Sequence, residues 1–176
     1  MSNEPRSLSV DQFDHHPYAS SRARDRDLNA AIIQAEISES FEKYIEIFDV
    51  FYGDDIEVSS ETREEAVRGK TRVRALLANF LVPLHVMAEV GGLSISIRET
   101  AIPGDVADET HSAWTVELVG VSGRTCTLSW CTLHKWNELR VVYEHHYDQQ
   151  QSGGPLTFDD LSFDALTPAA RFREPS

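Results

Sequence analysis

Among the side chains in the second half of the chain that can transfer protons, we select Glu117, His134 and His145 as candidates for catalysis. An imidazole beside a carboxylate can act as a general base or acid near neutral pH. We predict His145 as the catalytic base, Glu117 as the group that orients it, and His134 as a second catalytic candidate. Tyr143 or Tyr52 would donate a hydrogen bond to a carbonyl oxygen of the ligand.

A β-hairpin over residues 130–148 would position most of these groups. Both arms are rich in aromatic and β-branched residues, and Asn137-Glu138 is a short polar break between them. A tight turn fixes the register, and side chains alternate along a strand, so one face can be assigned. The residues predicted to share that face are Trp130, Thr132, His134, Tyr143 and His145. Large rings mixed with His, Thr and Tyr suit the wall of a pocket.

The turn at Ser122-Gly123 decides which side chains of the strand at residues 110–119 join this face. With an even number of turn residues, the residues that join it are His111, Thr115 and Glu117. The outward side chains are then Trp114, Val116 and Leu118, an apolar stripe that suggests a subunit interface. With an odd number and a bulge the faces swap, so that Trp114 enters the pocket and Glu117 leaves it. We favour the even turn, because Ser-Gly suits a tight primed turn.

Composition excludes several classes of protein. The 176 residues suffice for one domain with a real core. A net charge of −13 argues against binding nucleic acid or an anionic membrane through a basic surface. No apolar run approaches the ~20 residues of a membrane span, and none follows the N-terminus as in a signal peptide. Cys126 and Cys131 fall on opposite faces of one strand, so we read them as reduced thiols of a cytoplasmic protein.

The order of predicted elements indicates an α+β fold. We expect a flexible N-terminal arm at residues 1–27, the domain at 28–148, and a linker and C-terminal tail at 149–176. Within the domain we expect a long amphipathic helix that ends at Gly53, and a second helix that Pro83 breaks or bends. The predicted strands cover residues 54–59, 93–98, 110–119, 124–136 and 139–148.

Three phrases of the domain resemble the SnoaL-like branch of the NTF2-like superfamily. They lie at residues 48–58, 67–74 and 143–148, and the resemblance covers roughly residues 28–148. It implies a cone in which a curved, mostly antiparallel sheet wraps around N-terminal helices, with a pocket at the open end. It also implies a homodimer joined through the sheet and no cofactor. Functions in the family include polyketide cyclisation, steroid isomerisation, epoxide hydrolysis, dehydration and ligand binding.

One branch of the family can be compared residue by residue. In members similar to limonene epoxide hydrolase, the last strand carries a catalytic Asp, and a partner strand supplies an Arg and a second Asp. The matching positions in this chain are His145, Thr115 and Glu117. Only Glu117, at the position of the second Asp, is still an acidic residue, so we do not expect epoxide hydrolysis by that arrangement.

The sequence is consistent with two functions. The first is an isomerase, cyclase or hydrolase-type enzyme without cofactor that uses acid–base chemistry on a small apolar carbonyl compound. The second is a non-catalytic module that binds a ligand or dimerises, with the pocket open or filled by the tail at residues 156–172. We predict no metal site, because His111, His134 and His145 lack a tight ligand motif and the pair His15-His16 sits on the arm.

Overall fold

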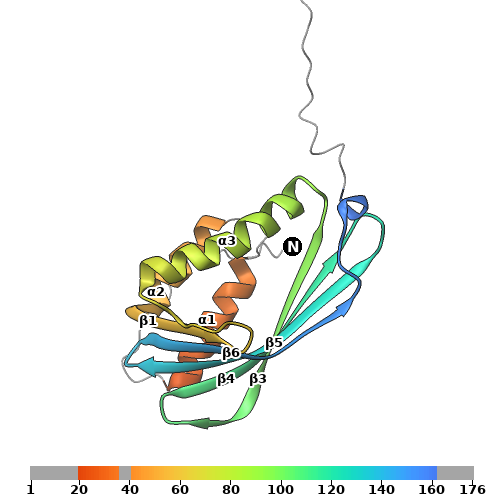
Figure 1. Cartoon of the computed structure of the whole chain (residues 1–176). Coiled ribbons are helices and arrows are strands. Elements are labelled where there is room, and N and C mark those ends of the chain that lie inside the picture. The colour runs from red at the N-terminus through yellow and green to blue at the C-terminus, as the bar shows by residue number, and fades with distance from the viewer. Residues whose placement is uncertain (1–19, 36–40, 162–176) are drawn as a thin grey trace, which may run out of the picture.

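The computed structural model describes residues 20–35 and 41–161, in which helices pack against the concave face of a curved six-stranded sheet (Figure 1). The strands are β1 (Tyr52–Ser60), β2 (Val67–Arg68), β3 (Ser94–Val106), β4 (Glu109–Val119), β5 (Thr125–Asn137) and β6 (Arg140–Gly153). Their spatial order is β2-β1-β6-β5-β4-β3, and the β1–β6 pair is parallel while the other pairs are antiparallel. The predicted α+β class is confirmed.

The helices are α1 (Ser21–Ala35), α2 (Phe41–Phe51) and α3 (Lys70–Glu89). The single long helix that the apolar spacing predicted is therefore two helices, and residues 36–40 between them lie outside the described part. Helix α1 begins at Ser21, inside the stretch expected to be an arm. Arg22 fixes this first turn to the sheet, since its guanidinium donates to the carbonyls of Ile102 (2.9 Å) and His111 (3.1 Å). Contacts between residues so far apart in the chain cannot be predicted from the composition of the N-terminal stretch.

Two apolar clusters hold the layers together. The first lies beneath α1 and α2 and contains Phe48, Ile56 and Val141. The second lies beneath the C-terminal part of α3, which continues through Pro83, and contains Leu84 and Val116. Burying each such side chain contributes about 1.5–3 kcal/mol, so the concave face of the sheet is the apolar one.

The predicted even turn between β4 and β5 is wrong. Val119 pairs with Thr125, so the loop is residues 120–124, an odd number. Trp114 consequently pairs with Trp130, and the side chains of Trp114, Val116 and Leu118 are buried against the helices instead of forming an outward stripe. The residues that lie on the convex face are His111, Thr115 and Glu117. Burial of the apolar β4 side chains outweighs the local preference of Ser-Gly for a two-residue turn.

The predicted register of the β5–β6 hairpin is also wrong. The two turn residues are Glu138 and Leu139, since Asn137 pairs with Arg140. Strand β6 then has a bulge at residue 142, because Trp136 pairs with Val141 but Lys135 pairs with Tyr143. One extra residue reverses the alternation of the residues that follow, as far as Tyr147, where β6 has a second irregularity in its pairing with β5. Tyr143 and His145 therefore lie on the convex face, and Glu144 and His146 face the helices.

Strand β6 continues to Gly153, through most of the predicted linker. Beyond it, Leu156 and Leu161 pack against the second apolar cluster. Asp160 is fully buried, accepts a hydrogen bond from the Ser122 hydroxyl, and its carbonyl accepts from the Val121 N–H (2.8 Å). His15-His16 and the tail after Leu161 lie outside the described residues. Within the described ranges, no helix is long and apolar enough to cross a membrane.

Candidate functional site

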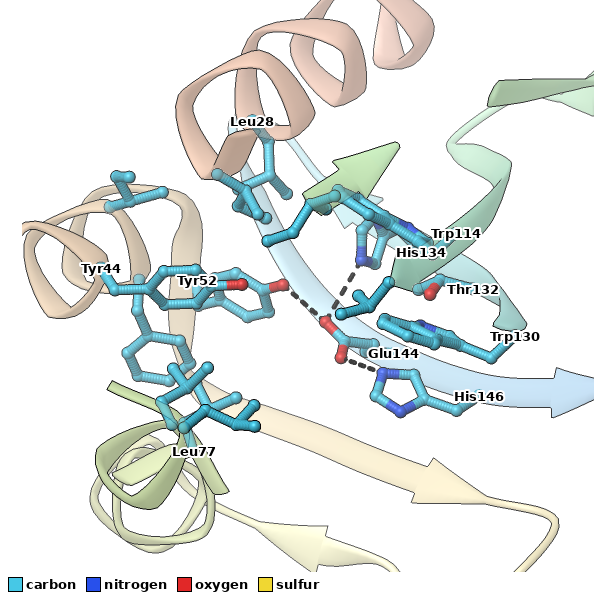
Figure 2. Close-up of a pocket in the computed structure, with 17 residues that line it drawn as sticks. Leu28, Tyr44, Tyr52, Leu77, Trp114, Trp130, Thr132, His134, Glu144 and His146 are labelled. Atoms are coloured by element: carbon cyan, nitrogen blue, oxygen red, sulfur yellow. Dashed lines mark hydrogen bonds and ion pairs between the residues drawn. The ribbon is translucent and has the colours of Figure 1, made fainter. Parts of the chain in front are cut away.

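A cavity of about 130 Å³ lies between the helices and the concave face of the sheet (Figure 2). All three helices and strands β3 and β4 contribute apolar side chains to it, among them Leu28, Phe48, Leu81, Ile97 and Trp114. The rings of Trp114 and Trp130 stack along one wall, with centroids 6.3 Å apart. An apolar engineered cavity of ~150 Å³ binds benzene, so a space of this size suits a single six-membered ring.

The polar end of the cavity is organised around Glu144 of β6, whose side chain is buried. One carboxylate oxygen, Oε2, accepts a hydrogen bond from the Tyr52 hydroxyl at 2.5 Å and another from Nε2 of His134 at 3.2 Å. The other oxygen, Oε1, lies 2.5 Å from Nε2 of His146. Figure 2 shows these three partners converging on the carboxylate from β1, β5 and β6.

A second buried carboxylate holds His134 from behind. Nδ1 of His134 lies 2.7 Å from Oδ1 of Asp25, which helix α1 supplies. The other oxygen of Asp25 accepts from the Ser112 hydroxyl (3.1 Å) and lies 3.3 Å from the Arg22 guanidinium. The side chains of Asp25, His134, Glu144 and His146 thus form a continuous row from α1 to the cavity, which we call the relay.

The charges along the relay support one another. Burial lowers the pKa of His134, but hydrogen bonds and charges from Asp25 and Glu144 outweigh burial and raise it to about 9. Burial raises the pKa of Glu144, yet the charge that His146 carries when it is protonated and the hydrogen bonds from His134 and His146 hold it well below its usual range. Asp25 shows the same balance, and its pKa is lowered through His134. His134 is therefore a buried cation between two carboxylates at neutral pH.

This charge state limits what His134 can do. An imidazolium that donates from both nitrogens has no lone pair with which to accept a proton. His134 lies where the hairpin prediction placed it, on the concave face, but its geometry is that of a group that positions Glu144.

The raised pKa of His134 predicts how stability depends on pH. A free imidazole has a pKa of 6.5 and His134 one of about 9, so its contribution is complete below pH 6.5 and is lost as the pH rises through 9. The shift corresponds to about 3 kcal/mol, and the free energy of unfolding should fall by roughly that amount between pH 6.5 and 9.5. Urea denaturation across this range measures the slope, and a flat profile would contradict the assignment.

Two groups at the cavity are free to meet a ligand. Among the described residues, none hydrogen-bonds to Nδ1 of His146, whose ring packs 6.4 Å from that of Trp130. None bonds to the hydroxyl of Tyr44 either, which lines the cavity. Burial and the negative charge of Glu144 raise the pKa of Tyr44, so this hydroxyl stays protonated and can donate. The site thus offers one proton acceptor and one hydrogen-bond donor.

The predicted site residues divide into two groups. Those that line the cavity are Tyr52, Trp130, Thr132 and His134. Those that lie on the convex face of the sheet instead are His111, Thr115, Glu117, Tyr143 and His145. There, the ring of His145 stacks between those of Tyr143 and Tyr147, and its Nδ1 lies 2.7 Å from the Ser59 hydroxyl. The inward placement of His145 and Glu117 is therefore corrected, because the bulge in β6 and the odd loop before β5 turn both residues outward.

Reasoning from the sequence missed four members of the site, namely Asp25, Tyr44, Glu144 and His146. Glu144 and His146 flank the predicted His145 and were placed on the opposite face by the absence of a bulge from the predicted hairpin. Asp25 belongs to the stretch read as an arm. Trp114 was foreseen only in the alternative with an odd loop, and its apolar neighbours Val116 and Leu118 were the available signal for that choice.

No protein-family model matches this chain, and no curated protein does. Solved structures do show a likeness. A proposed SnoaL-like polyketide cyclase from Mesorhizobium loti has a TM-score of 0.48 and 12% identity, over 73% of this chain and 99% of that one. An NTF2-like protein of unknown function from Exiguobacterium sp. 255-15 gives 0.47 and 15%, over 73% and 97%. A proposed polyketide cyclase from Xanthomonas campestris gives 0.49 and 17%, over 73% and 92%. By their descriptions, these three solved structures are SnoaL-like, NTF2-like or polyketide cyclase proteins.

Proposed function

We propose that the protein is an enzyme without cofactor that uses acid–base chemistry on a small apolar carbonyl compound. The observation that carries the proposal is the hydrogen-bonded pair Glu144–His146 at the end of an apolar cavity, in which no residue of the described ranges bonds to Nδ1 of His146. A carboxylate on one ring nitrogen of a histidine fixes the tautomer and strengthens the other nitrogen as a base. The same logic orients histidine in many catalytic sites.

The cavity would hold the ring of the substrate, and its carbonyl oxygen would accept a hydrogen bond from the Tyr44 hydroxyl. Nδ1 of His146 would then remove a proton from the carbon next to the carbonyl, while Tyr44 stabilises the negative charge that develops on oxygen. Glu144 stabilises the imidazolium that forms. Return of the proton to a different carbon would complete an isomerisation. Attack of the enolate carbon on a second carbonyl would form an alkoxide, and transfer of the proton from the His146 imidazolium to that alkoxide would complete a cyclisation.

The remainder of the relay serves to position Glu144. The carboxylate oxygens of Glu144 accept hydrogen bonds from Tyr52, His134 and His146, so the carboxylate cannot rotate without breaking a buried hydrogen bond. A buried group that loses such a partner costs about 1–3 kcal/mol. Asp25 in turn keeps His134 charged, which ties the orientation of the site to helix α1.

Exchange of carbon-bound hydrogen with solvent tests the proposal without knowledge of the natural substrate. The full-length protein would be incubated in D₂O with a panel of small cyclic and aryl ketones, and deuterium at the carbon next to the carbonyl followed by NMR. We expect exchange above the buffer rate for at least one ketone. Ketones that bind tightly but exchange only at the buffer rate would favour a ligand-binding module.

Replacing Tyr44 with Phe tests the predicted oxyanion contact. Its hydroxyl bonds to no described residue, so Tyr44→Phe should change the free energy of unfolding by less than about 0.5–1 kcal/mol. The exchange rate should fall by about 10²-fold or more, because loss of one such donor costs that much in other enzymes. Tyr147→Phe is the control, because it removes a tyrosine hydroxyl from the convex face, away from the cavity, and it should leave exchange unchanged.

The binding alternative keeps one specific observation in its favour. The polar groups of Tyr52 and His134 are already occupied by Glu144, so the cavity offers few polar contacts and is otherwise apolar. Such a site can hold an apolar molecule by burial alone.

A cytoplasmic homodimer joined through the sheet remains part of the proposal. The apolar β4 side chains that suggested this interface in the sequence, Trp114, Val116 and Leu118, are buried within the protomer. The contact would instead involve the convex-face residues His111, Tyr143, His145 and Tyr147. Their rings stack or bond with one another, as His111 does with the Tyr147 hydroxyl at 3.0 Å. Sedimentation equilibrium of the full chain would detect the dimer.

A further inference from the structure

A second hollow adjoins the cavity. This outer groove encloses about 580 Å³ and runs between α3, the end of β1, and the paired ends of β5 and β6. The residues that line both spaces are Tyr52, Leu77, Trp130, Glu144 and His146. The proposed base and its carboxylate therefore stand at the junction of the two spaces, and a ligand held by both would pass directly beside them.

The two spaces differ in chemistry. The cavity takes an apolar group of about one ring, as its volume and its lining require. The outer groove keeps an apolar floor but adds hydroxyl and amide side chains along its rim, which are Ser60, Thr62, Asn79, Ser129, Gln149, Gln150 and Gln151. Oε1 of Gln149 accepts from the hydroxyls of Ser60 (2.7 Å) and Thr62 (2.8 Å), which orients the amide. Its NH₂ group is left as a donor.

The charge of the groove stands out on this chain. The protein has a net charge of −13, yet among the residues that line the groove the only acid is Glu144, at the junction. The rim carries one cation, Arg63, and among the described residues no carboxylate forms an ion pair with it. An arginine without a partner, beside amide donors, is the arrangement that recognises a carboxylate.

We infer that the ligand has two ends, an apolar ring in the cavity and a carboxylate-bearing chain in the outer groove, where Arg63 selects for the acid. The inference rests on the proposed function only for one point, that the reacting carbon lies where the ring joins the chain, beside His146. The selection of the acid is a property of binding and stands apart from turnover.

Matched pairs of probes test this selection. Isothermal titration calorimetry would compare 3-phenylpropionate, 4-phenylbutyrate and 5-phenylvalerate with the alcohols of the same length at low salt. We expect at least one acid to bind about 5- to 10-fold tighter than its alcohol, and the difference to shrink at 0.5 M NaCl, because an exposed ion pair is screened.

Substitutions then assign the preference to Arg63. Arg63→Gln should remove the difference between acid and alcohol, and Arg63→Lys should retain part of it. Arg98→Gln is the matched control, because this substitution removes the same charge. Arg98 is exposed on β3 and lines neither space. Leu84→Trp should weaken acid and alcohol alike, since Leu84 lines the cavity and not the groove.

Three results would overturn the inference. They are equal binding of acid and alcohol, a preference that survives in Arg63→Gln, and no binding of any acid at millimolar concentration. Failure of the proposed function looks different, because a protein that catalyses no proton exchange can still show the full preference for the acid. His146→Asn separates the two, since it should lose exchange and keep the preference.

Discussion

Replacing His134 with Gln is expected to lower the free energy of unfolding by about 3–5 kcal/mol, the cost of removing one partner from a buried ion pair. Asp25 and Glu144 would remain buried as two anions, and a glutamine amide can donate to only one of them at a time. Domains of this size are stable by about 5–15 kcal/mol, so the variant should still fold but with a clear loss in urea denaturation.

The control for this result is His145→Gln. His145 is the neighbouring strand's histidine on the convex face, half-buried, with one hydrogen bond to the Ser59 hydroxyl, and its loss should cost about 1 kcal/mol or less. His134→Gln should also flatten the decline in stability between pH 6.5 and 9.5, and His145→Gln should preserve it. A loss below about 1 kcal/mol in His134→Gln would show that the relay holds no buried cation.

The second large effect concerns turnover. His146→Asn should slow deuterium exchange into a ketone substrate by about 10²–10⁴-fold, the range that general acid–base catalysis contributes. Asparagine keeps a donor for Glu144 but has no basic nitrogen, so the carboxylate stays satisfied while the proton acceptor is lost. The affinity for a ketone, measured by calorimetry, should change little.

The adjacent histidine supplies the control here as well. His145→Asn removes an imidazole one residue away, but on the opposite face of β6, and should leave the exchange rate unchanged. The reverse outcome, with exchange lost in His145→Asn and kept in His146→Asn, would return the catalytic role to the residue that the unbulged hairpin predicted. Equal loss in both variants would indicate damage to β6 rather than loss of a base.

The arrangement of the relay explains why a buried polar row is tolerated in this core. Each member shares a hydrogen bond with the next, and the hydroxyls of Ser112 and Tyr52 donate to the carboxylates of Asp25 and Glu144. Buried polar networks stabilise a fold only when every member is satisfied. Because Asp25 comes from α1 and the other three come from the sheet, the network also fixes where the first helix lies on the cone.

The sequence by itself determined the fold class and most of the strands. Apolar and polar residues alternate over Leu93 to Arg98 and over residues 110–119, because each strand buries one face. The aromatic and β-branched residues at 130–148 favour strands over other structures. It also identified the hairpin from which Trp130, Thr132 and His134 reach the cavity. These features depend on residues close together in the chain, where periodicity is a direct physical signal.

Only the tertiary structure decided which histidine and which acid face the cavity. An extra residue in β6 and an odd loop before β5 reverse the alternation, and each depends on how well the whole strand packs against helices that are distant in sequence. The local cost of the five-residue loop before β5 is small beside the burial of Trp114, Val116 and Leu118 on β4. The place of Asp25 in the site was also decided by the tertiary structure, because its partner His134 lies 109 residues away in the chain.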